Sequence, residues 1–391
     1  MGTRKHRPGV RAVVALAAVI AAIAAAGCSS SGSGSSSGGG TASAAPSSTA
    51  VNTSQCGTKP GVKATGTPIP LGAIATNQPG TSFTDIPNMA AAYFACVNAN
   101  GGINGHPIKL YIETEQTNPA QIAADAKQLV QTDHVVGIVG NTSILECTID
   151  HSYWEKLGYF VVDSGIAPEC YSTPNSAAVN MGPRYSSDGA VQYALSQHVS
   201  KVVFDQSNVP GTGYIAAGPA ALAAAAHTPI VQLTENVPIS DANSVAIKEV
   251  DDAGPNGAVI LNFTPPDVTS TPKMALYRAI LAQYGHSVSG GIGSFSQMGF
   301  AEAEIMVHAL ESVKGAYTVA SVNAALKAVK NFNTGMLCQG WTYGSYPMHI
   351  PNNVDYTTTP DNGQMVTAQG CTPISSADPQ IAAYRKAAGT G

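Results

Sequence analysis

The chain has 391 residues, of which 44% are hydrophobic and only 11% are charged, whereas charged residues make up about 25% of a typical globular protein. The hydrophobic fraction excludes a disordered chain. The net charge of −5 at pH 7 excludes a basic surface for nucleic acid or anionic lipid. Without residues 1–27, which hold four basic residues and no acidic one, 15 basic and 24 acidic residues remain, a net charge of −9.

The N-terminus predicts export from the cytoplasm. Four basic residues up to Arg11 precede an apolar run over 12–26, which is typical of a secretory signal and too short for a comfortable membrane span. The run ends in "AAGC", and small residues before a cysteine resemble the processing site of bacterial lipoproteins, with Cys28 as the lipidated residue. We therefore expect a signal peptide over 1–27 and a flexible Ser/Gly-rich tether over 28–65.

Six cysteines follow Cys28, and an even number in an exported chain indicates disulfides. No two of them form a CxxC pair, so a zinc or redox site is the weaker interpretation. Many connectivities are possible for six cysteines, and we expect neighbours to pair. The expected bonds are Cys147–Cys170, Cys338–Cys371 and Cys56–Cys96.

The first half of the folded chain alternates strand and helix patterns. Apolar strands are predicted at 68–75, 108–114, 135–140 and 159–165, and amphipathic helices at 86–97, 119–131 and 147–158. Apolar strands that alternate with amphipathic helices predict a parallel sheet covered on both faces.

The pattern restarts after "NMGPRYSSDGA". Helices are predicted at 188–198, over an Ala-rich segment, at 245–254 and at 295–310, and strands at 201–206, 229–237 and 257–263; from Met336 onwards only strand and turn patterns remain. The folded part exceeds what one hydrophobic core usually supports. We predict two lobes, with lobe 1 over 66–184 and 296–330 and lobe 2 over 185–295 and 331–391.

The order of the motifs resembles the type I periplasmic binding proteins, specifically the branched-chain amino acid (Leu/Ile/Val) binding family. "NANGGINGHPIKLYIET" is the most specific match, and "LGAIA", "VVGIVGNTS", "YFVVDSGIAPE", "AVILNFTPPD" and "FSQMGFAEAEIMVHAL" follow in the family's order. The resemblance implies an α/β fold, with two doubly wound parallel-sheet lobes joined by a three-crossover hinge.

The family also implies a function. A small molecule would be captured between the lobes and delivered to an ABC permease, by an extracytoplasmic lipoprotein anchored to the outer face of the cell membrane. No enzyme activity, cofactor, metal or nucleic acid is expected, and the protein is expected to be a monomer. The alternatives are a tethered ligand-sensing or scaffold protein that signals to a partner and, third, a secreted hydrolase.

Ligands of open parallel sheets bind beyond the carboxyl ends of the strands. Asn141, Thr142 and Ser143 would there present hydroxyl and N–H groups to a carboxylate or another acceptor, but Thr142 or Ser143 equally suits an N-cap. Ser164 and Gly165 are similar candidates, and a plain loop turn is the alternative for them.

In the family, aromatic side chains from both lobes cover the ligand, and the candidates here are Phe83, Tyr214, Phe263 and Phe295. Members that bind an amino acid usually place a carboxylate on lobe 2 to meet the ammonium. Asp267 is the candidate for that carboxylate, although a helix cap suits it better. An unpaired buried ammonium is costly, so a neutral, aromatic or acidic solute is as plausible as an amino acid.

Catalytic interpretations find little support in the sequence. Ser143 follows a strand but lacks the GxSxG pattern of a nucleophile elbow, and Asp150 and His151 resemble a polar helix face. Glu304 and His308 have the i, i+4 spacing of metal ligands without a third ligand, so a surface pair is the better interpretation.

Overall fold

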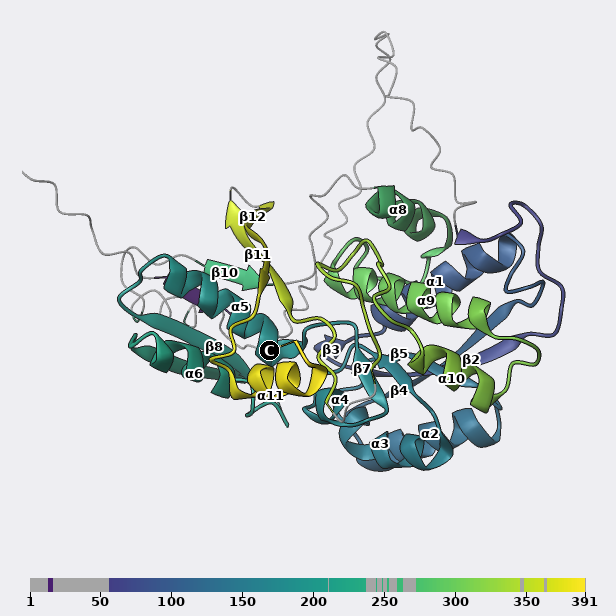
Figure 1. The fold of residues 1–391 in the computed structure, drawn as a ribbon, viewed down its shortest axis with the longest axis horizontal. Helices are drawn as coiled ribbons and strands as arrows, with labels where there is room; N and C mark the ends of the chain where they lie inside the picture. Colours follow the sequence, from purple (N-terminus) through teal and green to yellow (C-terminus); the bar gives the residue numbers. More distant parts are fainter. Residues whose placement is uncertain are drawn as a thin grey trace, which may run out of the picture.

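The computed structural model describes residues 56–209, 211–236, 272–344, 348–361 and 364–390, together with residues 244, 248 and 252 and the strands at 13–16 and 259–262. Within this part of the chain, two lobes lie side by side, each built on one sheet (Figure 1). The predicted fold class is confirmed. The predicted helix at 245–254 lies almost wholly outside the described residues, as do Cys28, Phe263 and Asp267.

The sheet of the first lobe has the order β3-β2-β5-β6-β7, with β4 on the other side of β2. All of its pairings are parallel except the short β2–β3 hairpin. The strands are β2 (Ile69–Gln78), β3 (Thr81–Ser82), β4 (Ile108–Glu115), β5 (Gly137–Asn141), β6 (Val161–Asp163) and β7 (Ser176–Ala178).

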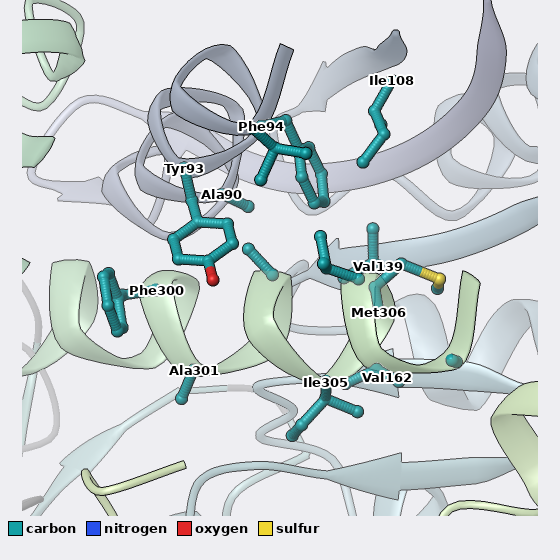
Figure 2. Close-up of a cluster of buried hydrophobic side chains, with 14 of the residues drawn as sticks. Ala90, Tyr93, Phe94, Ile108, Val139, Val162, Phe300, Ala301, Ile305 and Met306 are labelled. Atoms are coloured by element: carbon teal, nitrogen blue, oxygen red, sulfur yellow. The ribbon is translucent and has the colours of Figure 1, made fainter. Parts of the chain in front are cut away.

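Helices cover both faces of this sheet, because their apolar stripes and the strands bury each other. Tyr93 and Phe94 of α1 point towards α9, where Phe300 and Met306 meet them above the sheet (Figure 2). The rings of Tyr93 and Phe300 pack edge to face, with centroids 5.0 Å apart. The helices of this lobe are α1 (Asp85–Ala99), α2 (Pro119–Gln131), α3 (Glu146–Leu157), α4 (Glu169–Ser172), α8 (Pro272–Tyr284), α9 (Ser294–Ser312) and α10 (Val319–Lys327).

The sheet of the second lobe has the order β12-β11-β10-β1-β8-β9. Its last two strands form an antiparallel hairpin on β10, as the strand and turn patterns after Met336 predict. The elements are α5 (Gly182–Ser196), β8 (Val202–Asn208), α6 (Ala217–Ala225), β9 (Ile230–Asn236), β10 (Val259–Asn262), β11 (Val354–Asp361), β12 (Gln364–Pro373) and α11 (Pro379–Ala388).

Strand β1 (Val13–Leu16) comes from the segment that the sequence predicts to be an export signal. Its backbone pairs in parallel with β8 on one side and with β10 on the other. The sequence "VVAL" suits a buried parallel strand as well as it suits the apolar region of a signal, because both favour Val, Ala and Leu.

The structure differs from the predicted lobe boundaries in two segments. Helix α8, expected in lobe 2, packs on α1 of the first lobe, and its Tyr277 and Ile280 are fully buried in that lobe's core. Residues 331–344, also expected in lobe 2, lie against the first sheet: the Trp341 indole N–H donates to the carbonyl of Ala178 at 3.2 Å. Both segments carry large apolar side chains. The free energy gained by burying these side chains, and not the position of the segments in the chain, decides the lobe on which they pack.

The structure has all three expected disulfides. Cys56–Cys96 fastens the start of the described chain to α1, and Cys147–Cys170 joins α3 to α4. Cys338–Cys371 is different because it joins the two lobes, from the 331–344 segment to β12. Among the described residues, no helix combines the length and the apolar character needed to span a bilayer.

Candidate functional site

The predicted binding loops of the first lobe meet at the carboxyl ends of β2, β5 and β6. Asn141 ends β5, and its side-chain oxygen accepts from the N–H of Ile74 in β2 at 2.8 Å. Its carbonyl accepts from the N–H of Ser164, just after β6, at 2.9 Å. The structure therefore brings Asn141 and Ser164 together, and Asn141 joins the end of β5 to the middle of β2 and to the residue after β6.

The alternative of an N-cap for Thr142 or Ser143 is wrong. Helix α3 begins at Glu146, and its N-cap residue, Leu145, forms no side-chain cap. Thr142 uses its N–H to bond the carbonyl of Ile74 at 2.9 Å. The hydroxyl of Ser143 is buried and has no hydrogen-bond partner within the described residues. A buried hydroxyl without a partner is costly, which makes it the clearest candidate contact for a ligand.

Apolar side chains from both lobes form a cluster next to these loops. Phe83 and Phe295 pack edge to face with ring centroids 5.4 Å apart. Ile144 and Ile166 complete the buried part of this cluster, which Val209, after β8 of the second lobe, also contacts. The structure thus brings together two of the four predicted aromatic residues.

Tyr214 contacts the other lobe through polar atoms instead of its ring face. Its hydroxyl, which starts from the second lobe, donates to the carbonyl of Ile166 in the first. Its own carbonyl accepts from Arg184 Nη1 at 3.1 Å, and Arg184 forms a buried ion pair with Asp378 at 2.7 Å. Tyr214 therefore helps to hold the two lobes together.

Gly165 is required by packing beneath the loop. A Cβ atom on Gly165 would lie 2.1 Å from the sulfur of Cys170. The Cys147–Cys170 bond therefore leaves room only for glycine at this position, which is a structural reason distinct from the predicted ligand contact.

Two buried carboxyl groups, those of Asp163 and Glu302, form hydrogen bonds with these loops. Neither of them is predicted as a site residue by the sequence. Asp163, at the end of β6, accepts from the N–H of Gly165 at 3.1 Å and from the hydroxyl of Ser176. The pKa of Asp163 is raised to about 8, mainly by burial and also by nearby Glu146, while these hydrogen bonds act in the opposite direction. A carboxyl oxygen of Glu302 in α9 is hydrogen-bonded to the hydroxyl oxygen of Ser164. Its only sequence signal is that it is one of two glutamates within the otherwise apolar run "GFAEAEIMV".

The described residues do not form the arrangement of side chains that a catalytic or metal site requires. His151 Nδ1 lies 2.8 Å from the carbonyl of Cys147, and Ser143 has no base. Glu304 pairs with Lys273, while the His308 ring stacks on Phe332 with centroids 4.3 Å apart. The acidic or thiol groups that lie close enough to share an ion in the described part are Cys147, Asp163 and Cys170, and the two cysteines form a disulfide.

Comparison with known families identifies the fold from the sequence. Residues 68–275 match the profile of a family described as "Periplasmic binding protein". This range covers more than half of the chain and runs from β2 to the start of α8. A search of curated proteins gave no match.

Solved structures share this architecture at low sequence identity. A branched chain amino acid ABC transporter from Thermus thermophilus with bound valine has a TM-score of 0.68 and 13% identity, over 82% of this chain and 99% of that one. A fatty acid ABC transporter substrate-binding protein from Thermomonospora curvata has a TM-score of 0.66 and 15% identity, over 82% and 95%. An ABC transporter substrate binding protein from Aeropyrum pernix has a TM-score of 0.66 and 12% identity, over 81% and 98%.

The raised pKa of Asp163 predicts that stability falls as pH rises. The unfolded carboxyl ionises near its ordinary pKa of about 3.9, whereas the folded one stays neutral up to about pH 8. The contribution of Asp163 to the free energy of unfolding is complete below pH ~4. It falls by on the order of 1.4 kcal/mol per pH unit between these two pKa values and is constant above them. Asp163→Asn should remove this slope, as measured by urea denaturation across that range.

A matched control is Asp133→Asn, at the surface end of α2, which should keep the slope of the wild type. Equal slopes in the wild type and Asp163→Asn would contradict the prediction.

Proposed function

Since the chain belongs to the periplasmic binding protein family, we propose that it is a solute-binding protein of an ABC importer, which captures a small molecule between its lobes and delivers it to a membrane permease. The observation that carries the proposal is the apolar cluster of Phe83, Ile144, Ile166 and Phe295, which Val209 of the second lobe also contacts. It lies at the strand ends where open parallel sheets bind ligands.

Opening of the lobes would expose this cluster to water. Hinge closure around a ligand is a familiar motion of two-lobed binding proteins. The contacts between the two lobes beside this cluster include Val209 and the hydroxyl of Tyr214. A bound solute would replace part of these contacts, so its shape and polarity have to match the apolar side chains and the free hydroxyl of Ser143.

The solute that fits has an apolar body and a hydrogen-bond acceptor. Amino acid-like compounds, amides and small aromatic or organic acids meet this description. The similar proteins from Thermus thermophilus and Thermomonospora curvata, with valine and fatty acid in their descriptions, agree with it. The solute class is therefore defined by apolar contacts and an acceptor group.

We further propose that the protein works outside the cytoplasm as a monomer, anchored by a lipid on Cys28 and free to rotate on the 28–65 tether. The basic residues before the apolar run, and the small residues before Cys28, support this. Removal of the signal would also take β1 out of the second sheet. The acidic mature chain suits a small-molecule partner and no nucleic acid.

Thermal unfolding in the presence of a solute panel tests the proposed function. The panel contains amino acids, their amides and small aliphatic and aromatic acids. A true ligand at about 100 times its Kd adds about 2.7 kcal/mol to the free energy of unfolding, and we expect at least one compound to reach this. A panel that leaves the melting temperature unchanged throughout would count against solute binding.

Replacement of the free hydroxyl separates binding from stability. Ser143→Ala should weaken the binding of the solute found in the panel by about 0.5–1.5 kcal/mol. It should leave stability within about 0.5 kcal/mol, since the hydroxyl has no hydrogen-bond partner among the described residues. Calorimetric titration and urea denaturation measure the two effects.

Thr76→Val is the contrasting variant for this experiment. Thr76 Oγ1 accepts from the N–H of Ile144 at 3.0 Å, so this change should cost about 1–3 kcal/mol of stability. If Ser143→Ala lost stability to the same degree and kept its affinity, the hydroxyl would be structural.

The anchor has its own test. Mass spectrometry of the protein from its host membrane should find an N-terminal peptide that begins at Cys28 and carries a diacylglycerol. Cys28→Ala should then appear in the soluble extracytoplasmic fraction. A chain cut elsewhere, or one without lipid, would refute the anchor and leave solute binding intact.

A further inference from the structure

Glu302 is an acidic residue buried directly beneath the proposed binding loops. It lies on α9, which packs against β5 and β6, and its side chain is fully buried. One of its carboxyl oxygens is in hydrogen-bond contact with the hydroxyl of Ser164, whose N–H bonds Asn141. The other oxygen has no hydrogen-bond partner among the described residues. Glu302 therefore reaches the loops of the site through Ser164.

No cation among the described residues balances a charge on Glu302. The groups that face it are Asp163 of β6 and the backbone of Gly140 in β5. Lys273 of α8 and Tyr93 of α1 meet Glu304, which lies on the other side of α9, and Lys327 of α10 lies over the ring of Phe160. Burial raises the pKa of Glu302 well above its ordinary value, and Asp163 raises it further, against the bonds to Ser164 and Gly140. Burial and the neighbouring Asp163 therefore favour the neutral acid over the carboxylate at this position.

The protonation state of Glu302 decides which way the Ser164 hydroxyl points. A carboxylate only accepts hydrogen bonds, so an ionised Glu302 holds the Ser164 proton. A neutral carboxylic acid has an O–H of its own, which can donate to Ser164 Oγ. The serine proton is then free to donate to a third group.

We propose that Glu302 is a positioning residue, which as a neutral acid donates to Ser164 so that the Ser164 hydroxyl donates to the carboxylate of a bound apolar acid. This inference rests on the proposed solute-binding function. The apolar acid fits because Ile166, two residues after Ser164, belongs to the apolar cluster. The unpaired hydroxyl of Ser143 supplies a second donor.

The charge of the ligand follows from the same arrangement. A carboxylate placed beside Ser164 is repelled by an ionised Glu302 or Asp163 and tolerated by the neutral acids. An ammonium at that place would instead favour the ionised acids. The affinity of an apolar carboxylate must therefore fall with rising pH, and the affinity of an ammonium ligand must rise.

Calorimetric titrations with two probes, 4-methylpentanoate and leucine, test the inference between about pH 6 and about pH 9. The probes share the carboxylate and the branched chain and differ in the α-ammonium. We expect the wild type to bind 4-methylpentanoate more tightly than leucine. Its affinity for 4-methylpentanoate should fall about tenfold per pH unit once Glu302 begins to ionise.

Three variants locate this pH dependence. Glu302→Gln keeps an N–H donor for Ser164, and its affinity for 4-methylpentanoate should fall less steeply with pH than that of the wild type, because only Asp163 still ionises in this range. Ser164→Ala should bind it weakly at every pH, and it keeps the inference testable if Glu302→Gln does not fold. Glu304→Gln, a second buried glutamate of the same helix, should keep the wild-type profile.

The outcomes separate the inference from the proposed function. Affinity that rises with pH, or a Glu302→Gln profile equal to that of the wild type, overturns the inference. If neither probe binds while another compound of the panel does, the inference fails and solute binding stands. If no compound binds at all, both fail.

Discussion

The hydrogen bond from the N–H of Ile74 to the side chain of Asn141 organises the proposed site. It ties the end of β5 to β2, while the Asn141 carbonyl ties the same point to the residue after β6. The loops after β5 and β6 are thereby fixed against β2, in a buried region where backbone groups need partners. The apolar cluster and the free Ser143 hydroxyl both extend from this framework, so ligand contacts would be made by a preorganised part of the lobe.

Much of the fold follows from the sequence because its strands and helices have clean periodicities. The predicted strand at 135–140 is β5, and the predicted helix at 86–97 is the middle of α1. Lobe membership is harder to predict, since it depends on contacts made after folding. Tyr277 and Trp341 follow second-lobe segments in the chain, yet both are buried in the core of the first lobe.

The residues of the proposed site remain a prediction from loop positions, and the residues that support them in the structure were not predicted. Loop positions at strand ends indicated Asn141, Ser143 and Ser164, because the carboxyl ends of parallel strands share one edge. Nothing local distinguishes Glu302 from a polar position on a helix, as its partner lies 138 residues earlier in the chain. Gly165 is explained by the neighbouring sulfur of Cys170, a contact that sequence spacing alone does not reveal.

The Cys338–Cys371 bond changes the consequence of a proteolytic cut between the two lobes. Cys338 belongs to the segment packed on the first lobe and Cys371 to β12 of the second, so the crossover through residues 344–353 lies inside the loop that the bond closes. A protease that cut this crossover once would leave the following segment, with β11, β12 and α11, covalently joined to the first lobe through this bond. Only cleavage together with a reductant would release that segment, so in an oxidising compartment it survives a nick that would otherwise free it.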